Sequence, residues 1–242
     1  MADDATSWSE TESAVYRTLS RYAVPDRERQ IEIMISLIGA AALDGPILDL
    51  CCGEGLVSEA ILKAMTSVTV HAFDGSTSML DDARQRIGES DRLVTREIDL
   101  GADDWRRTDV AYRAVVSSLA VHHLDGEGKR KLFADIHTML APGGVFVLAD
   151  VIRPARPVGH EIAAELWDEA VKHRSLALDG TLAGYQAFRR ADWNHFRHEE
   201  LDPIDKPSTL VEHLDWLRSA GFADVDAHWM TAGQVLLSGW KH

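Results

Sequence analysis

The sequence predicts an α/β fold in which helices cover both faces of a mostly parallel sheet. Three observations predict it. Short apolar runs alternate with helix-like segments through the middle of the chain, those runs are apolar on both faces, and two β-like segments joined by a short turn end the chain. Parallel strands covered on both sides give continuous apolar runs, whereas a tight turn allows only antiparallel pairing. The expected sheet is therefore parallel except for one strand.

Two helices are expected before the sheet, within residues 11–43. Tyr16, Leu19 and Ala23 recur at helical spacing before Pro25 breaks the chain, and a second apolar stripe with the same period follows it. The alternation comes next. Strands are expected at 47–50, 68–73, 93–98, 110–118 and 145–149, and helices at 56–65, 77–88 and 126–140.

The C-terminal part of the chain breaks this alternation. A helix at about 208–220 is followed by strands at 223–229 and 234–239. Residues 153–207 form a helical insertion, which is expected to overhang the carboxyl edge of the sheet, where open α/β sheets bind ligands. We expect one domain over residues 1–242, with a helical cap over 1–44 and a helical lid over 153–207.

Composition and charge exclude several classes of protein. The chain carries 39 acidic and 25 basic residues, a formal net charge of −14, so its surface repels phosphate backbones and anionic lipid. No apolar run approaches the roughly 18 to 20 residues of a membrane span, and the acidic N-terminus does not predict a secretory signal. The two cysteines, Cys51 and Cys52, are adjacent and do not predict a disulfide framework. A cytoplasmic protein is expected.

The strongest motif is the segment from Ile47 to Gly55, an apolar strand followed by a glycine turn that opens a helix. Gly53 and Gly55 allow the backbone to approach a ligand closely, and the helix N-terminus offers free N–H groups. Asp74 ends the next strand, 21 positions after Gly53, where a carboxylate can accept hydrogen bonds from both ribose hydroxyls. Asp49 would repel a pyrophosphate but suits a ligand with an ammonium group. The motif therefore favours a nucleoside bearing an amino acid over a dinucleotide.

With these residues the chain resembles the class I S-adenosylmethionine-dependent methyltransferases. Asp49, Gly53 and Gly55 match the family pattern D-x-G-x-G-x-G, whereas Cys51 replaces its first glycine, which leaves the loop conformation open. Residues 140–144 match the common L-x-P-G-G turn. The resemblance implies a Rossmann-like fold with seven strands in the order 3-2-1-4-5-7-6, the seventh antiparallel, and S-adenosyl-L-methionine as cofactor.

The resemblance also implies a set of cofactor-binding residues. Asp74 would bind the ribose, Met79 would pack on the adenine, and Asp99 with Leu100 would meet the adenine ring. Ser117 would line the methionine moiety, and an arginine or tyrosine of the N-terminal helix would meet its carboxylate. The cofactor-binding residues expected are Tyr16, Arg21, Asp49, Gly53, Gly55, Asp74, Met79, Asp99, Leu100 and Ser117.

His122 and His123 are the candidate catalytic residues, because they lie where the methyl group of the cofactor should point. A general base is needed only if the acceptor carries a proton of high pKa. Adjacent residues face different ways, so only one of the two is expected to face the pocket. His195 and His198 have a spacing that could bind metal, but they are interpreted as part of the lid surface, and no metal site is predicted.

The function expected is methyl transfer to a small-molecule acceptor. Two alternatives are a tRNA-modifying methyltransferase, which short arginine clusters would support, and a cofactor-binding subunit without catalysis, which the change at Cys51 would support. Nucleic acid and membrane are not expected partners, and a homodimer is left open. The aromatic residues of 153–207 could line an acceptor pocket or simply pack the lid. The acceptor atom is left open.

Overall fold

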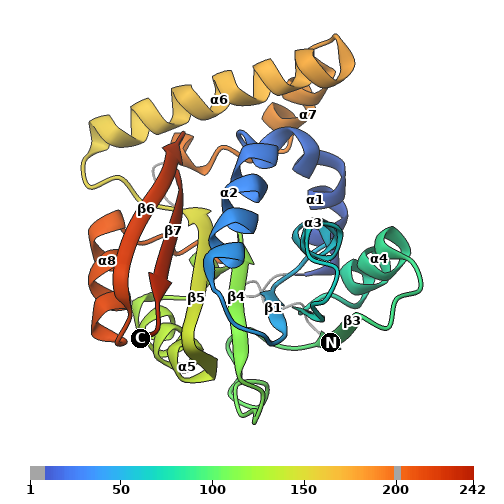
Figure 1. Cartoon of the computed structure of the whole chain (residues 1–242). Helices are drawn as coiled ribbons and strands as arrows, with labels where there is room; N and C mark the ends of the chain where they lie inside the picture. Colours follow the sequence, from blue (N-terminus) through green and yellow to red (C-terminus); the bar gives the residue numbers. More distant parts are fainter. Residues whose placement is uncertain (1–8, 199–202) are drawn as a thin grey trace.

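The computed structural model describes residues 9–198 and 203–242. The expectations for 1–8 and 199–202 lie outside these ranges. A single seven-stranded sheet runs through the molecule, and α6 lies across its carboxyl end (Figure 1). The strands are β1 (Ile47–Leu50), β2 (Val70–Asp74), β3 (Leu93–Glu97), β4 (Tyr112–Ser118), β5 (Leu140–Val151), β6 (Ala223–Thr231) and β7 (Gln234–Trp240).

The sheet has the order β3-β2-β1-β4-β5-β7-β6, which confirms the predicted order. The first five strands pair in parallel, and β7 is antiparallel to both of its neighbours. Leu50 pairs with Phe73 on one side and with Ser117 on the other, so the carboxyl ends of β1, β2 and β4 lie at one edge. This edge is where the three loops of the site begin.

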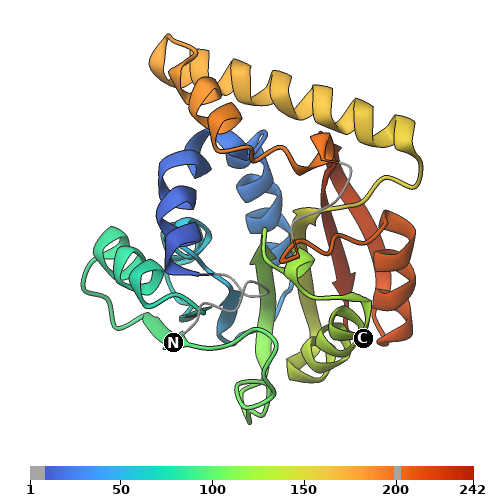
Figure 2. The same cartoon turned by 180° about the vertical axis from the view of Figure 1, so that it is seen from behind.

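Helices cover both faces of the sheet, and each face has its own apolar core. Met34, Ile38 and Ile61 belong to the core under α2 and α3, while Phe133 and Leu217 belong to the core under α5 and α8. Figure 2 shows α5 and α8 beside the sheet from behind. The helices are α1 (Glu10–Ala23), α2 (Arg27–Ala40), α3 (Leu56–Ala64), α4 (Thr77–Ile87), α5 (Gly126–Met139), α6 (Pro157–Asp179), α7 (Ala183–Arg190) and α8 (Leu210–Ser219).

The start of β5 differs from the expectation of a turn at residues 140–144. The strand begins at Leu140, which pairs with Tyr112, and a register shift precedes the pair Ala114–Val145. Gly143 has a φ of +82° and donates its N–H to the carbonyl of Lys241. The glycines therefore form an irregularity within the strand, because the pairing with β4 begins before them.

The lid packs on the N-terminal cap through a third apolar cluster. Trp167 and Phe188 have ring centroids 5.5 Å apart, and Phe196 lies in the same cluster. The Trp167 indole N–H donates to the Ala23 carbonyl at 2.7 Å. These aromatic side chains are therefore lid packing, the second of the two uses left open for them. No helix within the described ranges is long and apolar enough to cross a membrane.

Candidate functional site

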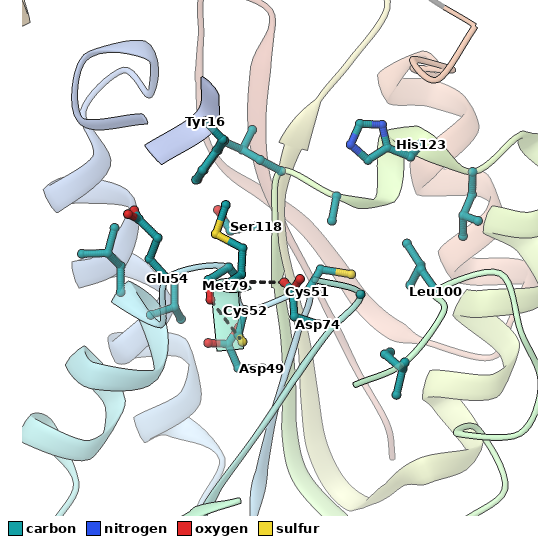
Figure 3. Close-up of a pocket in the computed structure, with 18 of the residues that line it drawn as sticks. Tyr16, Asp49, Cys51, Cys52, Glu54, Asp74, Met79, Leu100, Ser118 and His123 are labelled. Carbon is teal, nitrogen blue, oxygen red and sulfur yellow. Dashed lines mark hydrogen bonds between the residues drawn. The ribbon is translucent and has the colours of Figure 1, made fainter. Parts of the chain in front are cut away.

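A cavity of about 690 Å³ lies at the carboxyl edge of the sheet, between the β1, β2 and β4 loops and the cap. This volume lies in the range of small-molecule sites. Figure 3 shows Tyr16 and His123 on one side of the cavity, with Asp49 and Asp74 across from them. Eight expected cofactor or catalytic residues line it: Tyr16, Asp49, Gly53, Asp74, Met79, Asp99, Leu100 and His123. Gly55, which was also expected at the cofactor, does not line the cavity; it is the N-cap of α3.

Gly53 and Gly55 serve different purposes in the loop after β1. A Cβ on Gly55 would lie 2.8 Å from the Ala83 Cβ, so this glycine allows α4 to pack against the start of α3. A Cβ on Gly53 would meet nothing within 4 Å, although its φ is +52°. Gly53 therefore provides the left-handed conformation and leaves open space toward the cavity.

Cys51, at the place of the family's first glycine, has a left-handed backbone conformation. Its φ is +58°, in the left-handed region that favours glycine. Such a residue costs about 1–2 kcal/mol of conformational energy, which its packed surroundings must hold in place. Burial raises the pKa of the Cys51 thiol well above its ordinary value, as do the nearby acids beginning with Asp74. The thiol is therefore a neutral, packed side chain rather than a nucleophile.

Asp74 joins the ends of β1 and β2. Its Oδ2 accepts the Gly53 N–H at 2.8 Å, and its Oδ1 accepts the Ser76 N–H at 2.9 Å. Burial raises the pKa of the Asp74 carboxyl, against the lowering effect of these backbone hydrogen bonds. Each carboxylate oxygen can accept further hydrogen bonds, so the group can bind a ligand's hydroxyls while it holds the loop.

Asp49 lies beneath the loop and is fully buried. Burial raises its pKa to about 7, opposed by the Ser58 hydroxyl, which donates to it at 2.6 Å, and reinforced by the charge of Asp74. Near neutral pH this carboxyl is therefore close to half ionised. A positively charged ligand above it favours the ionised form.

Replacing Asp49 by asparagine is expected to change stability with a definite pH dependence. The folded protein holds this proton more tightly than the unfolded chain, so wild-type stability falls as pH rises from about 4 to 7. Above that window, the free energy of unfolding of the Asp49→Asn apoprotein should exceed that of wild type by up to about 4 kcal/mol. Denaturant titrations at acidic and alkaline pH measure the difference. The exposed Asp44→Asn is the control, and an Asp49→Asn effect that does not grow with pH would contradict the expectation.

Two further expected cofactor residues, Arg21 and Ser117, do not line the cavity. The Arg21 guanidinium is 2.9 Å from Asp179 at the end of α6, and its side chain is 54% exposed. Ser117 is fully buried, and its hydroxyl donates to the Leu50 carbonyl at 2.8 Å. Arg27 and Ser118 line the cavity instead. Arg27, whose Nη2 lies 3.1 Å from the Tyr16 hydroxyl, is thus the arginine at the pocket.

The two candidate catalytic histidines face different ways, as expected of neighbours. His122 is buried, and its Nδ1 lies 2.5 Å from the Asp150 carboxylate. His123 lines the cavity, and its Nδ1 lies 3.2 Å from the Ile204 carbonyl and 3.3 Å from Asp205 Oδ1. Because Nδ1 of His123 faces two hydrogen-bond acceptors, we assign the ring hydrogen of the neutral histidine to Nδ1. The proton-accepting nitrogen of neutral His123 is then Nε2.

The pKa values in this group are set by burial and by neighbouring charges. Burial and the charge of His122 lower the pKa of His123. Burial would also lower that of His122, but the Asp150 charge and hydrogen bond raise it. Burial would raise the pKa of Asp205, yet the hydrogen bond from His123 and the charge of His122 bring it to about 2. At neutral pH an anionic Asp205 therefore faces a neutral His123.

His122, His123 and Asp205 each have a potential ligand atom within 4.8 Å of the others. We interpret the group as a hydrogen-bonded relay, because His123 Nδ1 faces the Ile204 carbonyl as well as Asp205 and so carries a hydrogen. The earlier candidates His195 and His198 do not form a pair on a helix. His195 lies in a 3₁₀ turn, where burial lowers its pKa to about 4.

Comparisons with known proteins agree with this fold. The family described as "Methyltransferase domain" matches residues 47–144. A carboxy-S-adenosyl-L-methionine synthase of Pseudoalteromonas atlantica is 24% identical over 90% of this chain and 85% of that protein. A demethylmenaquinone methyltransferase of Clavibacter sepedonicus is 29% identical over 79% of this chain and 71% of that protein.

The fold also matches solved structures. The S-adenosylmethionine-dependent methyltransferase SibL superposes with a TM-score of 0.62 at 17% identity, over 95% of this chain but 58% of that one. The fold, the glycine loop with its acid, and these relatives define a class I S-adenosylmethionine-dependent enzyme. The chain has the class I S-adenosylmethionine-dependent methyltransferase fold, and a methyltransferase domain matches its residues 47–144.

Proposed function

We propose that the protein transfers the methyl group of S-adenosylmethionine to a small-molecule acceptor bound on the cap side of the cavity. The observation that carries the proposal is His123 on the cavity wall, oriented by Asp205, across from the loop and acid that suit a nucleoside. The bound cofactor supplies an electrophilic methyl group. Asp74 would accept hydrogen bonds from the ribose, and Asp49 would favour the positive charge above it.

The role of His123 follows from its charge state. Because its pKa is lowered, the ring is neutral at pH 7 and Nε2 can accept a proton from an acceptor hydroxyl or amine. Asp205 then stabilises the imidazolium that forms. Cap and lid cover the carboxyl edge of the sheet and limit the access of water to the reacting centre (Figure 1).

Isothermal titration calorimetry with S-adenosylmethionine and its demethylated product is the direct test of cofactor binding. We expect saturable binding of both. Turnover is then measured with methyl-labelled cofactor and a panel of small phenols, amines and carboxylic acids. Binding without any transfer of label, across the panel and in cell extract, would leave a non-catalytic subunit and contradict the proposal.

A second candidate function is the synthesis of carboxy-S-adenosyl-L-methionine, the activity in the name of the relative from Pseudoalteromonas atlantica. Its similarity extends over 90% of this chain, well beyond the matched domain at 47–144. The cavity lining also includes two cations, Arg27 and Lys206, which could face a carboxylate donor. The two reactions are distinguished by mass spectrometry. Methyl transfer moves the labelled carbon to the acceptor and leaves the demethylated cofactor, whereas cofactor carboxylation keeps the label on a heavier sulfonium.

A further inference from the structure

The helix α5 buries a lysine among its apolar residues. Lys129 shares the inward face of the helix with Leu132, Phe133 and Ile136, and its side chain is fully buried. Burial of an ammonium group is unfavourable unless hydrogen bonds or opposite charges compensate for it. Burial accordingly lowers the pKa of Lys129 to about 8, while the charge of Asp150 opposes the fall. At pH 7 the side chain is therefore still charged, and it needs hydrogen-bond acceptors that an apolar residue would not.

Two acceptors of the Lys129 ammonium lie in one distant segment, residues 204–208. Nζ donates to the Lys206 carbonyl and, at 2.8 Å, to the Ser208 hydroxyl oxygen. The same segment also contacts the turn that carries the two histidines, since the Lys206 N–H donates to the His122 carbonyl at 2.8 Å. Lys129 and the backbone of His122 therefore hold the segment from two sides.

The held segment carries Asp205. The Asp205 Oδ1 lies 3.3 Å from His123 Nδ1 and 3.5 Å from His122 Nε2. Its two neighbours in the sequence are held through their carbonyl groups, Ile204 by His123 and Lys206 by the buried ammonium. A short side chain moves with its backbone, so the place of this carboxylate depends on these attachments.

We propose that Lys129 is a positioning residue for His123. Its ammonium fixes residues 204–208 against α5, and the fixed segment keeps the Asp205 carboxylate beside the imidazole ring. Lys129 does not itself line the cavity, so it acts on the reaction through Asp205. This inference rests on the role proposed above for His123, but the arrangement of the three side chains can be tested without any methyl transfer.

A direct electrostatic effect of Lys129 on the histidines would have the opposite sign. Burial and the charge of Lys129 lower the pKa of His122, so removal of that charge alone would raise the pKa of a neighbouring histidine. Burial lowers the pKa of His123, whereas the hydrogen bond and charge of Asp205 raise it, so displacement of Asp205 lets this pKa fall further. The other charged groups around the ammonium stay in place when Lys129 is replaced: Asp125, Asp150, Lys206 and Glu212. The sign of the shift at His123 therefore separates positioning from charge.

The titration of the His123 ring in the apoprotein, followed by NMR, tests the proposal. Lys129→Met keeps the length and the apolar stem of the side chain but removes both hydrogen bonds. The pKa of His123 should fall toward its value in Asp205→Asn, and the ring signal is identified by its absence from His123→Ala. Lys131→Met is the control, because this lysine lies on the same helix, pairs with Asp103 and has a side chain that is 51% exposed. It should leave the pKa of His123 at the wild-type value.

A second variant keeps the test decisive where circular dichroism shows that Lys129→Met does not fold. Ser208→Ala removes one acceptor and leaves the ammonium in place. It should shift the pKa of His123 in the same direction, by a smaller amount. Because the charge of Lys129 is retained, a fall in this variant comes from the loosened segment.

Kinetics provide a further readout. The kcat of Lys129→Met should be about 10- to 100-fold lower than that of wild type, as expected when a catalytic group is misplaced. The Kd of the demethylated cofactor should stay within a few-fold, and the acidic limb of the pH profile should move to lower pH. A His123 pKa that is unchanged or raised in the folded variants would overturn the proposal. Absence of methyl transfer by wild type would contradict the proposed function instead and leave the result of the titration standing.

Discussion

Replacing His123 by alanine is expected to lower kcat by about 10²- to 10⁴-fold, the usual contribution of a general base. The Kd of the demethylated cofactor should stay within a few-fold, because the loop residues that hold it are unchanged. Steady-state kinetics with an accepted substrate, together with calorimetry, separate the two effects. A variant that keeps its kcat would show that the acceptor needs no base or that another group provides it.

The pH dependence of the rate distinguishes a base from a structural histidine. Because the pKa of His123 is lowered from its ordinary value of 6.5, the wild-type rate should be level at neutral pH and fall at acidic pH. Asp205→Asn removes the negative charge that stabilises the protonated ring. The pKa of His123 should then fall further, so the acidic limb moves to lower pH while the maximal rate decreases. An unmoved limb would contradict the pairing of these two residues.

Replacing Asp74 by alanine is expected to weaken cofactor binding by about 30- to 1000-fold, equivalent to about 2–4 kcal/mol. The substitution removes the acceptor for a ligand's hydroxyls and also the acceptor for the N–H groups of Gly53 and Ser76. Calorimetry with the demethylated cofactor measures the loss of affinity.

Asp74→Asn is the matched comparison, since it keeps the shape but loses the charge and one acceptor. It should retain more affinity than alanine but less than wild type. Unchanged affinity in Asp74→Ala, with the fold intact, would place the cofactor away from this acid and contradict the site itself.

The fold was largely predictable because its central strands are short apolar runs, as expected of a sheet that helices cover on both faces. Alternation along the chain predicted the parallel sheet, and the tight turn before Gln234 predicted the antiparallel strand. The family resemblance was needed for the strand order. The predicted start of β5 was wrong. Pro142 and Gly143 are typical of a turn, but Leu140 already pairs with Tyr112, so the strand begins before them.

The candidate site was predictable where a residue ends a strand at the carboxyl edge of the sheet, as Asp74 does. Arg21 and Arg27 both lie in the cap, and only packing against Asp179 of the lid decides which of them turns away from the cavity. No local sequence pattern around Asp205 indicates that it belongs to the site. Its segment reaches His123 through a loop, with Ile204 lying 81 residues further along the chain than the histidine it contacts. Such a contact depends on the tertiary fold of the lid.

The bonds between lid and cap have a consequence for how ligands exchange. Arg174 of α6 donates to the Arg21 carbonyl at 2.9 Å and pairs through two nitrogens with Glu28, at 2.7 and 3.0 Å. With the Trp167 bond to Ala23, these contacts join α6 to both α1 and α2. α1, α2 and α6 are therefore joined into one unit, and we expect any opening of the cavity on its α1 and α2 side to displace α6 as well.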